Sequence, residues 1–360
     1  MPTLFPAFAA RRWVAAGVCG LLALAIAGPA AARDRLPTST LNASSLTSAE
    51  EGEIEAFVSR WNTQLLEGSD REVAEAREAL LQPVRNATSD AFLNQYGEDI
   101  GDRLSTALEA RRLITRLNAM IVAGELGVRG VRGVIVKGLS DPSPAVNYWA
   151  AAGAVKLAQA REQGARISPS AVRDVLESLE GMLEDKRASN PLLYPSLRAA
   201  VAMNETEGDE LFLETLSRRL ELHARRPAID YRPLLQKGAW TRLIQRSITA
   251  RTDHGREMLK RSANLAARYF SLVSRQLEEG ELGEGPPRSH LDMMLWNQRL
   301  LATVNGFLDG PESTPDTREV RNAIENLDTN FLRLSASDWI ATLKKRPYLF
   351  TPEQLEIPEP

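Results

Sequence analysis

The chain has almost no cysteine. Cys19 is the only one in 360 residues, and it lies in an apolar stretch near the N-terminus. We expect this stretch to be removed on export, which leaves the mature protein without a thiol. An oxidising compartment then offers it no disulfide, no thiolate metal ligand and no cysteine nucleophile. The fold must therefore be held together by packing.

Histidine is also scarce, and the common catalytic motifs are missing. His223, His254 and His290 are the only three, and none lies four residues from another metal-ligand type. The stretch 289–292 (Ser-His-Leu-Asp) contains the residue types of a hydrolytic triad, but contiguous residues at a helix start point in different directions. The glycine-rich stretch 124–138 lacks the Gly-Lys-Ser/Thr ending of a phosphate loop. We predict no catalytic residue, no metal and no cofactor.

The N-terminus is typical of an export signal. Arg11 and Arg12 precede an uncharged apolar stretch over residues 13–26. A Gly-Pro break and three alanines ending at Ala32 follow, which fits the small residues of a cleavage site. We therefore predict a signal peptide over residues 1–32, cleaved near Ala32.

A membrane anchor is the main alternative for this segment. The apolar run is shorter than the roughly 20 residues that span a bilayer, and helix breakers follow it instead of a basic stop-transfer cluster. Twin-arginine export and lipidation at Cys19 are weaker alternatives, because the flanking residues match neither pattern closely. We expect an exported protein, periplasmic or extracellular, with no transmembrane segment in the mature chain.

Positive charge is not in excess. The chain has 44 basic and 47 acidic residues, a formal net charge of −3. Loss of Arg11 and Arg12 with the signal lowers the charge to −5. Such a surface argues against nucleic acid as a partner, because polyanion binding needs a basic face.

Alternating strand patterns are absent, whereas helical periodicity recurs along the mature chain. Residues 131–136 are the best strand candidate, but Gly127, Gly130 and Gly133 recur there every third residue. This spacing places the glycines on one side of a helix, where a neighbouring helix can approach closely. Each glycine weakens a helix by about 1 kcal/mol relative to alanine, so neighbouring elements must hold this one. The sequence predicts an all-α fold.

Helices and breaks repeat with a regular period in the first half. Breaks at Asp99, Asp141 and Asp185 are 42 and 44 residues apart. Helices are predicted over residues 113–126, 128–139, 145–161, 168–183 and 192–203. Helical-hairpin repeats of about 40 to 47 residues are typical of HEAT and armadillo arrays. Residues 48–205 are therefore predicted to form a helical region with degenerate repeats.

One turn carries a family resemblance. Residues 139–146 read Leu-Ser-Asp-Pro-Ser-Pro-Ala-Val, and Ala150 and Ala151 follow. This stretch resembles the turn and first helix of a HEAT repeat, although Asn147 stands where that family often has an arginine that bonds across repeats. The whole arrangement also resembles uncharacterised secreted HEAT-repeat proteins of bacteria. The resemblance implies an α-solenoid.

The second half follows a different spacing. Apolar residues alternate gaps of four and three over residues 259–277 and again over residues 320–334. Such seams suit nearly antiparallel helices, so we predict a C-terminal helical bundle over residues 206–345. The same seams also suit a homo-oligomer, in which they pack against a second subunit. A flexible leader is expected over residues 33–47 and a flexible tail over residues 346–360.

A stacked array of hairpins presents an extended surface, which favours binding over catalysis. We predict a noncatalytic exported scaffold that binds a protein partner. Arg129, Arg132 and Arg173 lie on corresponding helices of successive units and are the candidate binding residues, as a basic strip for an acidic partner. The alternative is a carbohydrate-active enzyme on an α/α toroid, which needs two carboxylates, or a tyrosine and a histidine, in a tryptophan-lined cleft.

Overall fold

The computed structural model describes most of the chain that follows the predicted signal. It covers residues 34–127, 129–164, 167–184, 189–225, 237–281, 288–310 and 317–357. The predicted signal, residues 1–32, lies outside these ranges. Among the helices that are described, none has the length and apolar content needed to cross a membrane.

Every regular element in the described ranges is a helix. The first half contains α2 (Thr38–Leu41), α3 (Ser48–Glu67), α4 (Asp70–Asn86), α5 (Asp90–Ala107), α6 (Leu113–Leu126), the 3₁₀ turn η1 (Arg129–Val131), α7 (Arg132–Leu139) and α8 (Pro144–Glu162). The second half contains α9 (Pro169–Glu184), α10 (Asn190–Ala202), α11 (Thr206–Arg225), α12 (Lys237–Ala250), α13 (Asp253–Glu278), α14 (Arg288–Leu308), α15 (Thr317–Asn326), α16 (Thr329–Leu343) and α17 (Pro352–Leu355).

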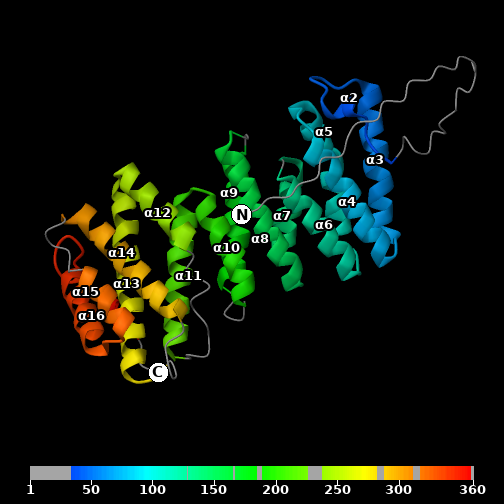
Figure 1. The fold of residues 1–360 in the computed structure, drawn as a ribbon. Helices are drawn as coiled ribbons and strands as arrows, with labels where there is room; N and C mark the ends of the chain where they lie inside the picture. The colour runs from blue at the N-terminus through cyan, green and yellow to red at the C-terminus, as the bar shows by residue number, and fades with distance from the viewer. Residues whose placement is uncertain are drawn as a thin grey trace, which may run out of the picture.

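The helices stack in two layers. In one layer, α3, α5, α7, α9, α11 and α13 each contact the next, and in the other α4, α6, α8, α10, α12 and α14 do the same. Consecutive helices cross between the layers as hairpins. Figure 1 shows the resulting elongated array, with α3 at one end and α15 and α16 at the other. The predicted all-α solenoid is confirmed.

Capping boxes mark the starts of the two helices of the first hairpin. Thr47 caps α3, with its side chain accepting from the Glu50 amide and the Glu50 carboxylate accepting from the Thr47 amide. Ser69 and Glu72 form the same reciprocal pair at the start of α4. Each box satisfies amide groups that a helix start leaves without a partner. These caps therefore stabilise the starts of α3 and α4.

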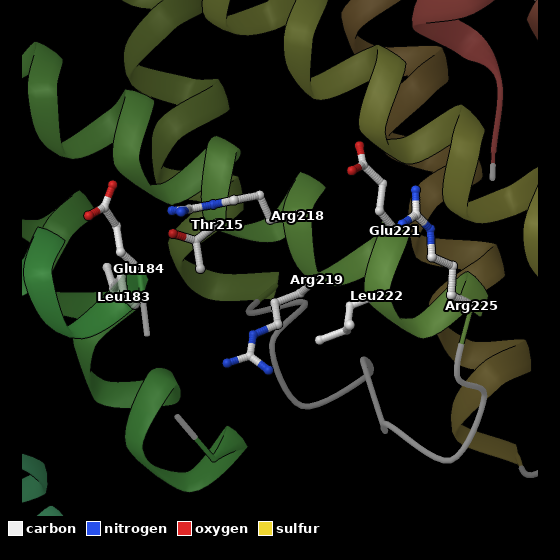
Figure 2. Close-up of a pocket in the computed structure, with 8 residues that line it drawn as sticks. All are labelled: Leu183, Glu184, Thr215, Arg218, Arg219, Glu221, Leu222 and Arg225. Atoms are coloured by element: carbon white, nitrogen blue, oxygen red, sulfur yellow. The ribbon is translucent and has the colours of Figure 1, made fainter. Parts of the chain in front are cut away.

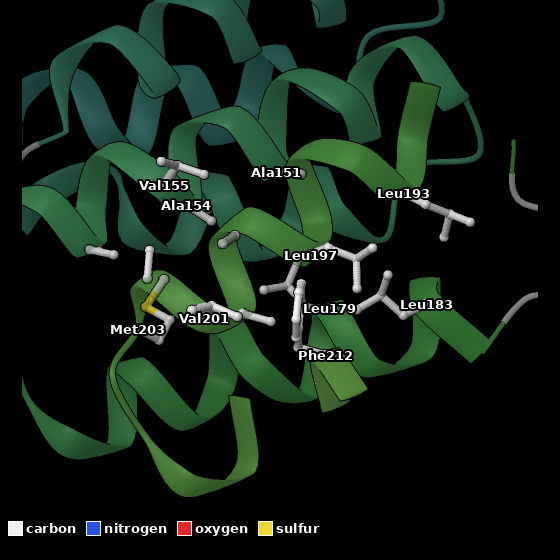
Figure 3. Close-up of a cluster of buried hydrophobic side chains, with 14 of the residues drawn as sticks. Ala151, Ala154, Val155, Leu179, Leu183, Leu193, Leu197, Val201, Met203 and Phe212 are labelled. Atoms are coloured by element: carbon white, nitrogen blue, oxygen red, sulfur yellow. The ribbon is translucent and has the colours of Figure 1, made fainter. Parts of the chain in front are cut away.

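Small residues allow the helices of the middle units to approach closely. Gly124 of α6 faces Gly153 of α8, and a Cβ added at Gly124 would lie 3.3 Å from the Gly153 Cα. Next to this contact, Ala151 and Ala154 of α8 pack with Leu197 of α10 in a core that also includes residues of α9 and α11 (Figure 3). The missing side chains at Gly124 and Gly153 therefore let α6 and α8 approach closely.

The three glycines predicted to share one helix face have three different roles. Gly127 ends α6 in the left-handed conformation, with φ of 57°, where glycine is favoured. Gly130 lies in η1 directly against the backbone of Gly97 and Gly101 in α5. Gly133 faces open space. Of these three glycines, only Gly130 allows the close approach of a neighbouring helix that the spacing predicted. The chain turns at Gly127 instead of continuing as one helix.

The turn that resembles a HEAT repeat is held by polar contacts. Asp141 accepts from the Ser143 amide at 2.7 Å and pairs with the Arg116 Nε at 3.0 Å. The Asn147 amide donates to the carbonyl oxygens of Gly138, Leu139 and Asp141 at 2.9, 3.1 and 2.8 Å. Asn147 therefore satisfies the carbonyls that α7 leaves open at its end.

Polar contacts also join residues that are one hairpin apart along the chain. Arginine side chains donate to carbonyl oxygens near the ends of neighbouring helices. These bonds run from Arg112 to Gly68, from Arg161 to Met203 and from Arg246 to Val201, over 2.6, 2.7 and 3.3 Å. Their partners are 44, 42 and 45 residues apart in sequence. This separation matches the predicted repeat length.

The array continues across the boundary predicted near residue 205. Helix α10 contacts both α11 and α12, and Arg246 of α12 bonds to α10. The predicted bundle is most distinct at the far end, where α13 contacts α14, α16 and α17. The seam over residues 320–334 is interrupted there, because Leu327 adopts φ of 55° and ends α15. Leu334 consequently faces solvent, with 56% of its surface exposed.

The expected flexible leader is partly folded. Thr40 and Leu41 of α2 are buried, and the Thr88 hydroxyl donates to the Asn42 side chain at 2.7 Å. The Ser89 hydroxyl bonds to the Ala43 carbonyl. A segment this short shows no periodicity, yet it can cover apolar surface at the end of the array.

The expected flexible tail packs in the same way up to residue 357. The Tyr348 hydroxyl donates to Asn305 at 3.0 Å, and the Asn264 amide donates to the Gln354 carbonyl at 2.9 Å. Leu355 is buried against the core. The prolines and acidic residues of this segment predicted a flexible tail, but a few buried side chains are enough to hold it in place.

The contact between η1 and α5 generates a prediction. Gly130→Ala should destabilise the protein by about 3 kcal/mol, because the new methyl group would meet backbone atoms that cannot move aside. Gly133→Ala, three residues further on, should be neutral or stabilising by up to about 1 kcal/mol, since alanine favours the helix and the site is open. Urea unfolding of both variants checks this, and equal midpoints would contradict it.

Candidate functional site

A groove runs between α9 and α11, which are neighbouring helices of one layer (Figure 1). Its volume is about 610 Å³. We call it the acidic groove and define it by its lining: Pro169, Val172, Arg173, Leu176, Glu177, Glu180, Glu205, Glu207, Glu210, Leu211 and Glu214. Glutamate is thus the commonest residue type of this surface.

The floor of the acidic groove is apolar and its rim is charged. Val172, Leu176 and Leu211 form the floor and are buried. The glutamates follow helical spacing, at positions 177 and 180 of α9 and positions 207, 210 and 214 of α11. Each helix therefore presents one row of carboxylates, and stacking α9 on α11 brings the two rows to one groove.

Most of these carboxylates have no cation beside them. Glu205 pairs with Arg161 at 2.7 Å, and Glu214 lies 3.5 Å from Arg261. The other four glutamates make no ion pair within the part of the chain that the structure describes. Several like charges in one groove create a negative potential that attracts cationic groups.

The predicted basic strip does not form as a single surface in the described residues. Arg173 lines the acidic groove, where glutamates outnumber it. Arg132 is half-buried on α7, the helix that contacts α9. The side chain of Arg129 lies outside the described residues. The local charge around Arg173 is therefore opposite in sign to the charge expected for that strip.

Asp209 anchors the first turn of α11 beneath this rim. Its side chain is only 6% exposed and pairs with Arg246, which also bonds to the Val201 carbonyl of α10. Burial raises the pKa of the Asp209 carboxyl, while the charges of Arg246 and His254 oppose that rise. The pair thus connects α10, α11 and α12 at the point where the groove begins.

A second cavity lies further along the same two helices, with a volume of about 270 Å³. Figure 2 shows its side chains, which come from the end of α9 and the second half of α11. We call it the arginine cavity and define it by Leu183, Glu184, Thr215, Arg218, Arg219, Glu221, Leu222 and Arg225. It shares no residue with the acidic groove, so α11 contributes to two surfaces of different character.

The histidines and tryptophans are distributed through the core. His223 and His290 are buried on different helices, and the His290 Nδ1 lies 3.4 Å from the Tyr269 hydroxyl. Trp240 is buried, and the Trp339 indole donates to Gln298 at 2.6 Å. Among the residues described, no three His, Cys, Asp or Glu side chains are close enough to hold a metal ion.

Sequence reasoning missed the acidic groove for a physical reason. Each row of glutamates, taken alone, has the spacing of an ordinary solvated helix face. The signal that could have revealed the groove is the combination of two such rows on helices one repeat apart. That inference needs the layer assignment, which determines that α9 faces α11.

The fold places this chain in the class of α-helical repeat proteins with an α-solenoid architecture. No family model matches the chain, and no curated protein matches it. Two crystal structures of engineered proteins are similar in shape. One is 12% identical over 69% of this chain and 97% of the other, with a TM-score of 0.41. The second is 15% identical over 82% and 81% of the two chains, with a TM-score of 0.37. Values this low establish no shared function.

The Asp209 ion pair generates a prediction with a defined pH dependence. Arg246→Met should destabilise the protein by about 3 kcal/mol at pH 7, because it leaves a buried carboxylate without its cation. When folding raises the pKa of an acid, the folded protein becomes more stable as pH falls toward that pKa. The loss should therefore be smaller at pH 5 than at pH 7.

Thermal unfolding at the two pH values measures this effect, and two variants control it. Arg242 lies on α12, as Arg246 does, and Arg242→Met breaks its exposed pair with Glu162 of α8. This variant should cost no more than about 0.5 kcal/mol. Adding Asp209→Leu to Arg246→Met should restore most of the loss. A loss that does not change with pH would show that Asp209 is not responsible.

Proposed function

We propose that this chain is an exported, noncatalytic scaffold of the HEAT type that binds a protein partner. The observation that carries the proposal is the acidic groove between α9 and α11, with its apolar floor and four glutamates that form no ion pair with any described residue. Such a groove suits a cationic segment with one or two apolar anchors. The expected partner segment is therefore basic, instead of acidic as the arginines alone suggested.

The energetics of such a complex follow from this division of the surface. Burying an apolar anchor on Val172, Leu176 and Leu211 contributes about 25 cal/mol per Å² of apolar surface removed from water. The glutamates at the rim add orientation and speed of association more than affinity. Binding should therefore weaken at high salt without disappearing.

The HEAT type and export are parts of the same proposal. Support for the HEAT type comes from the 141 turn and from arginine links between residues 42 to 45 positions apart. Support for export comes from the pattern over residues 1–32.

The alternative of a carbohydrate-active enzyme on an α/α toroid has less support. A toroid closes its helices into a ring, whereas α3 and α16 lie at opposite ends of this array (Figure 1). The tryptophans that a sugar cleft would use contribute to the core, as Trp240 and Trp339 do. Neither observation supports an active site for a carbohydrate-active enzyme.

A photo-crosslinking experiment identifies the partner and tests the groove. A photoreactive amino acid placed at position 177 in the groove should capture a partner segment of net positive charge. The same group at position 257, an exposed site on α13, is the matched control. Equal capture at the two positions would count against the groove.

Binding of the captured segment, as a synthetic peptide, then tests the charge argument. The double variant Glu177→Lys and Glu207→Lys should weaken binding by about tenfold or more, because two attractive contacts become repulsive. The control is Glu257→Lys with Glu319→Lys, which changes the net charge equally at exposed sites outside the groove. Titration calorimetry at two salt concentrations measures both. Equal effects of the two variants would overturn the proposal.

A further inference from the structure

Three of the large apolar side chains that face solvent lie on neighbouring helices of one layer. Leu113 of α6, Tyr148 of α8 and Tyr194 of α10 are 46, 40 and 42% exposed. Helix α8 contacts both α6 and α10. Exposed apolar surface that extends over several elements often marks an interaction site. We call this surface the aromatic face and define it by Leu113, Leu117, Ile121, Tyr148, Trp149, Ala152 and Tyr194.

The two tyrosines lie at matching positions of α8 and α10. Ala151 of α8 packs near Leu197 of α10, 46 residues later in the sequence (Figure 3). The same separation joins Tyr148 to Tyr194. An arginine near the end of α8 bonds to a carbonyl just beyond α10, so the two helices run in the same direction. Tyr148 and Tyr194 therefore lie at about the same level of the layer.

Leu117 continues this row onto α6. Lys156 of α8 forms an ion pair with Glu125 of α6, which lies 31 residues earlier. The same separation joins Tyr148 to Leu117, which is half-buried. Three successive helices of the layer therefore each present one large apolar side chain at the same level.

The distance between these side chains follows from helix packing. The axes of packed helices lie about 8 to 10 Å apart, so the row advances by about that distance at each helix. A polyproline II helix completes one turn of three residues in about 9 Å. An α-helix repeats every 5.4 Å, approximately, and does not place successive turns on successive side chains of such a row. The spacing of the row therefore matches an extended, proline-rich chain.

The charged side chains that border the aromatic face favour the same ligand. Arg116 pairs with Asp141 at 3.0 Å, and Glu125 pairs with Lys156. A sugar chain would bring many hydroxyl groups to this face, and each hydroxyl that binding buries needs a partner. Proline rings are apolar, and proline has no amide N–H to satisfy. Arg198, exposed one turn further along α10, can donate to the carbonyl oxygens that a polyproline II helix leaves open.

We propose that the aromatic face binds an extended, proline-rich segment of a protein partner, whose prolines pack on Leu117, Tyr148 and Tyr194. Aromatic side chains commonly line the grooves that bind such segments. Trp149 supports the central position, because its ring meets the Tyr148 ring edge to edge or in a T shape, with centroids 5.7 Å apart. The acidic groove lies on helices of the other layer, so this proposal stands or fails independently of the proposed function.

A blocked peptide of about ten prolines is the first probe, because roughly seven residues of a polyproline II helix span the row. Titration calorimetry should show saturable binding to the folded protein. A glycine-serine peptide of equal length is the control, since it is flexible and has no rings. In NMR spectra the indole N–H signal of Trp149 should shift during the titration. The signal of Trp339 should not, because that indole bonds to Gln298 inside the bundle.

Substitutions connect binding to the two tyrosines. Tyr148→Ala and Tyr194→Ala should each weaken binding of the proline peptide by about fivefold, because each removes one ring contact. Tyr148→Phe keeps the ring and should bind within about twofold of the unmodified protein. The matched control is Leu334→Ala, which removes an exposed apolar side chain of α16 outside the aromatic face. Circular dichroism checks that all four variants remain helical.

Three results would overturn the proposal. The first is no saturable binding of the proline peptide, and the second is equally tight binding of the glycine-serine peptide. The third is that Tyr148→Ala and Tyr194→Ala bind the proline peptide as tightly as Leu334→Ala does. A cello-oligosaccharide, titrated in parallel, tests the rival ligand. Saturable binding of the sugar without binding of the proline peptide would assign the aromatic face to a glycan and equally overturn the proposal.

Discussion

The structure depends on one constraint, that a helical hairpin cannot bury its apolar face by itself. Each hairpin of the array covers the face of the one before it and exposes its own to the one after. The close contacts in the middle show how tightly this is done, because Gly124 meets Gly153 and Gly130 meets the backbone of α5. The ends of the array have no next hairpin. The short segment around α2 covers apolar surface at one end, and α17 packs on α13, which explains why residues outside the repeats are buried.

Polar contacts between hairpins follow from the same stacking. When units of similar length are stacked, residues about one repeat apart in sequence come into contact. The open carbonyls at each helix end then face the next unit. Arginines at positions 112, 161 and 246 use this geometry in the same way, each reaching a helix-end carbonyl and a carboxylate. The Asn147 amide does a related task within one hairpin. These contacts define the register of the units, whereas the apolar core supplies most of the stability.

The acidic groove and the arginine cavity also result from stacking, through helix α11. Its first half carries the glutamates of the acidic groove and its second half carries the guanidinium groups of the arginine cavity. Because α9 runs beside it, both sets of charges lie next to a second helix.

The sequence by itself determined the all-α fold, because helical periodicity depends on residues close together in the chain. The turn at Asp141 is also a local pattern of this kind. The break predicted at Asp99 was wrong, since Asp99 lies inside α5. Only the tertiary structure decided which helix faces which. That arrangement placed Arg173 among glutamates, separated the roles of Gly127, Gly130 and Gly133, and turned two ordinary rows of carboxylates into a groove. The physical reason is that charge and shape at a surface depend on neighbours about forty residues away, whose position no local pattern encodes.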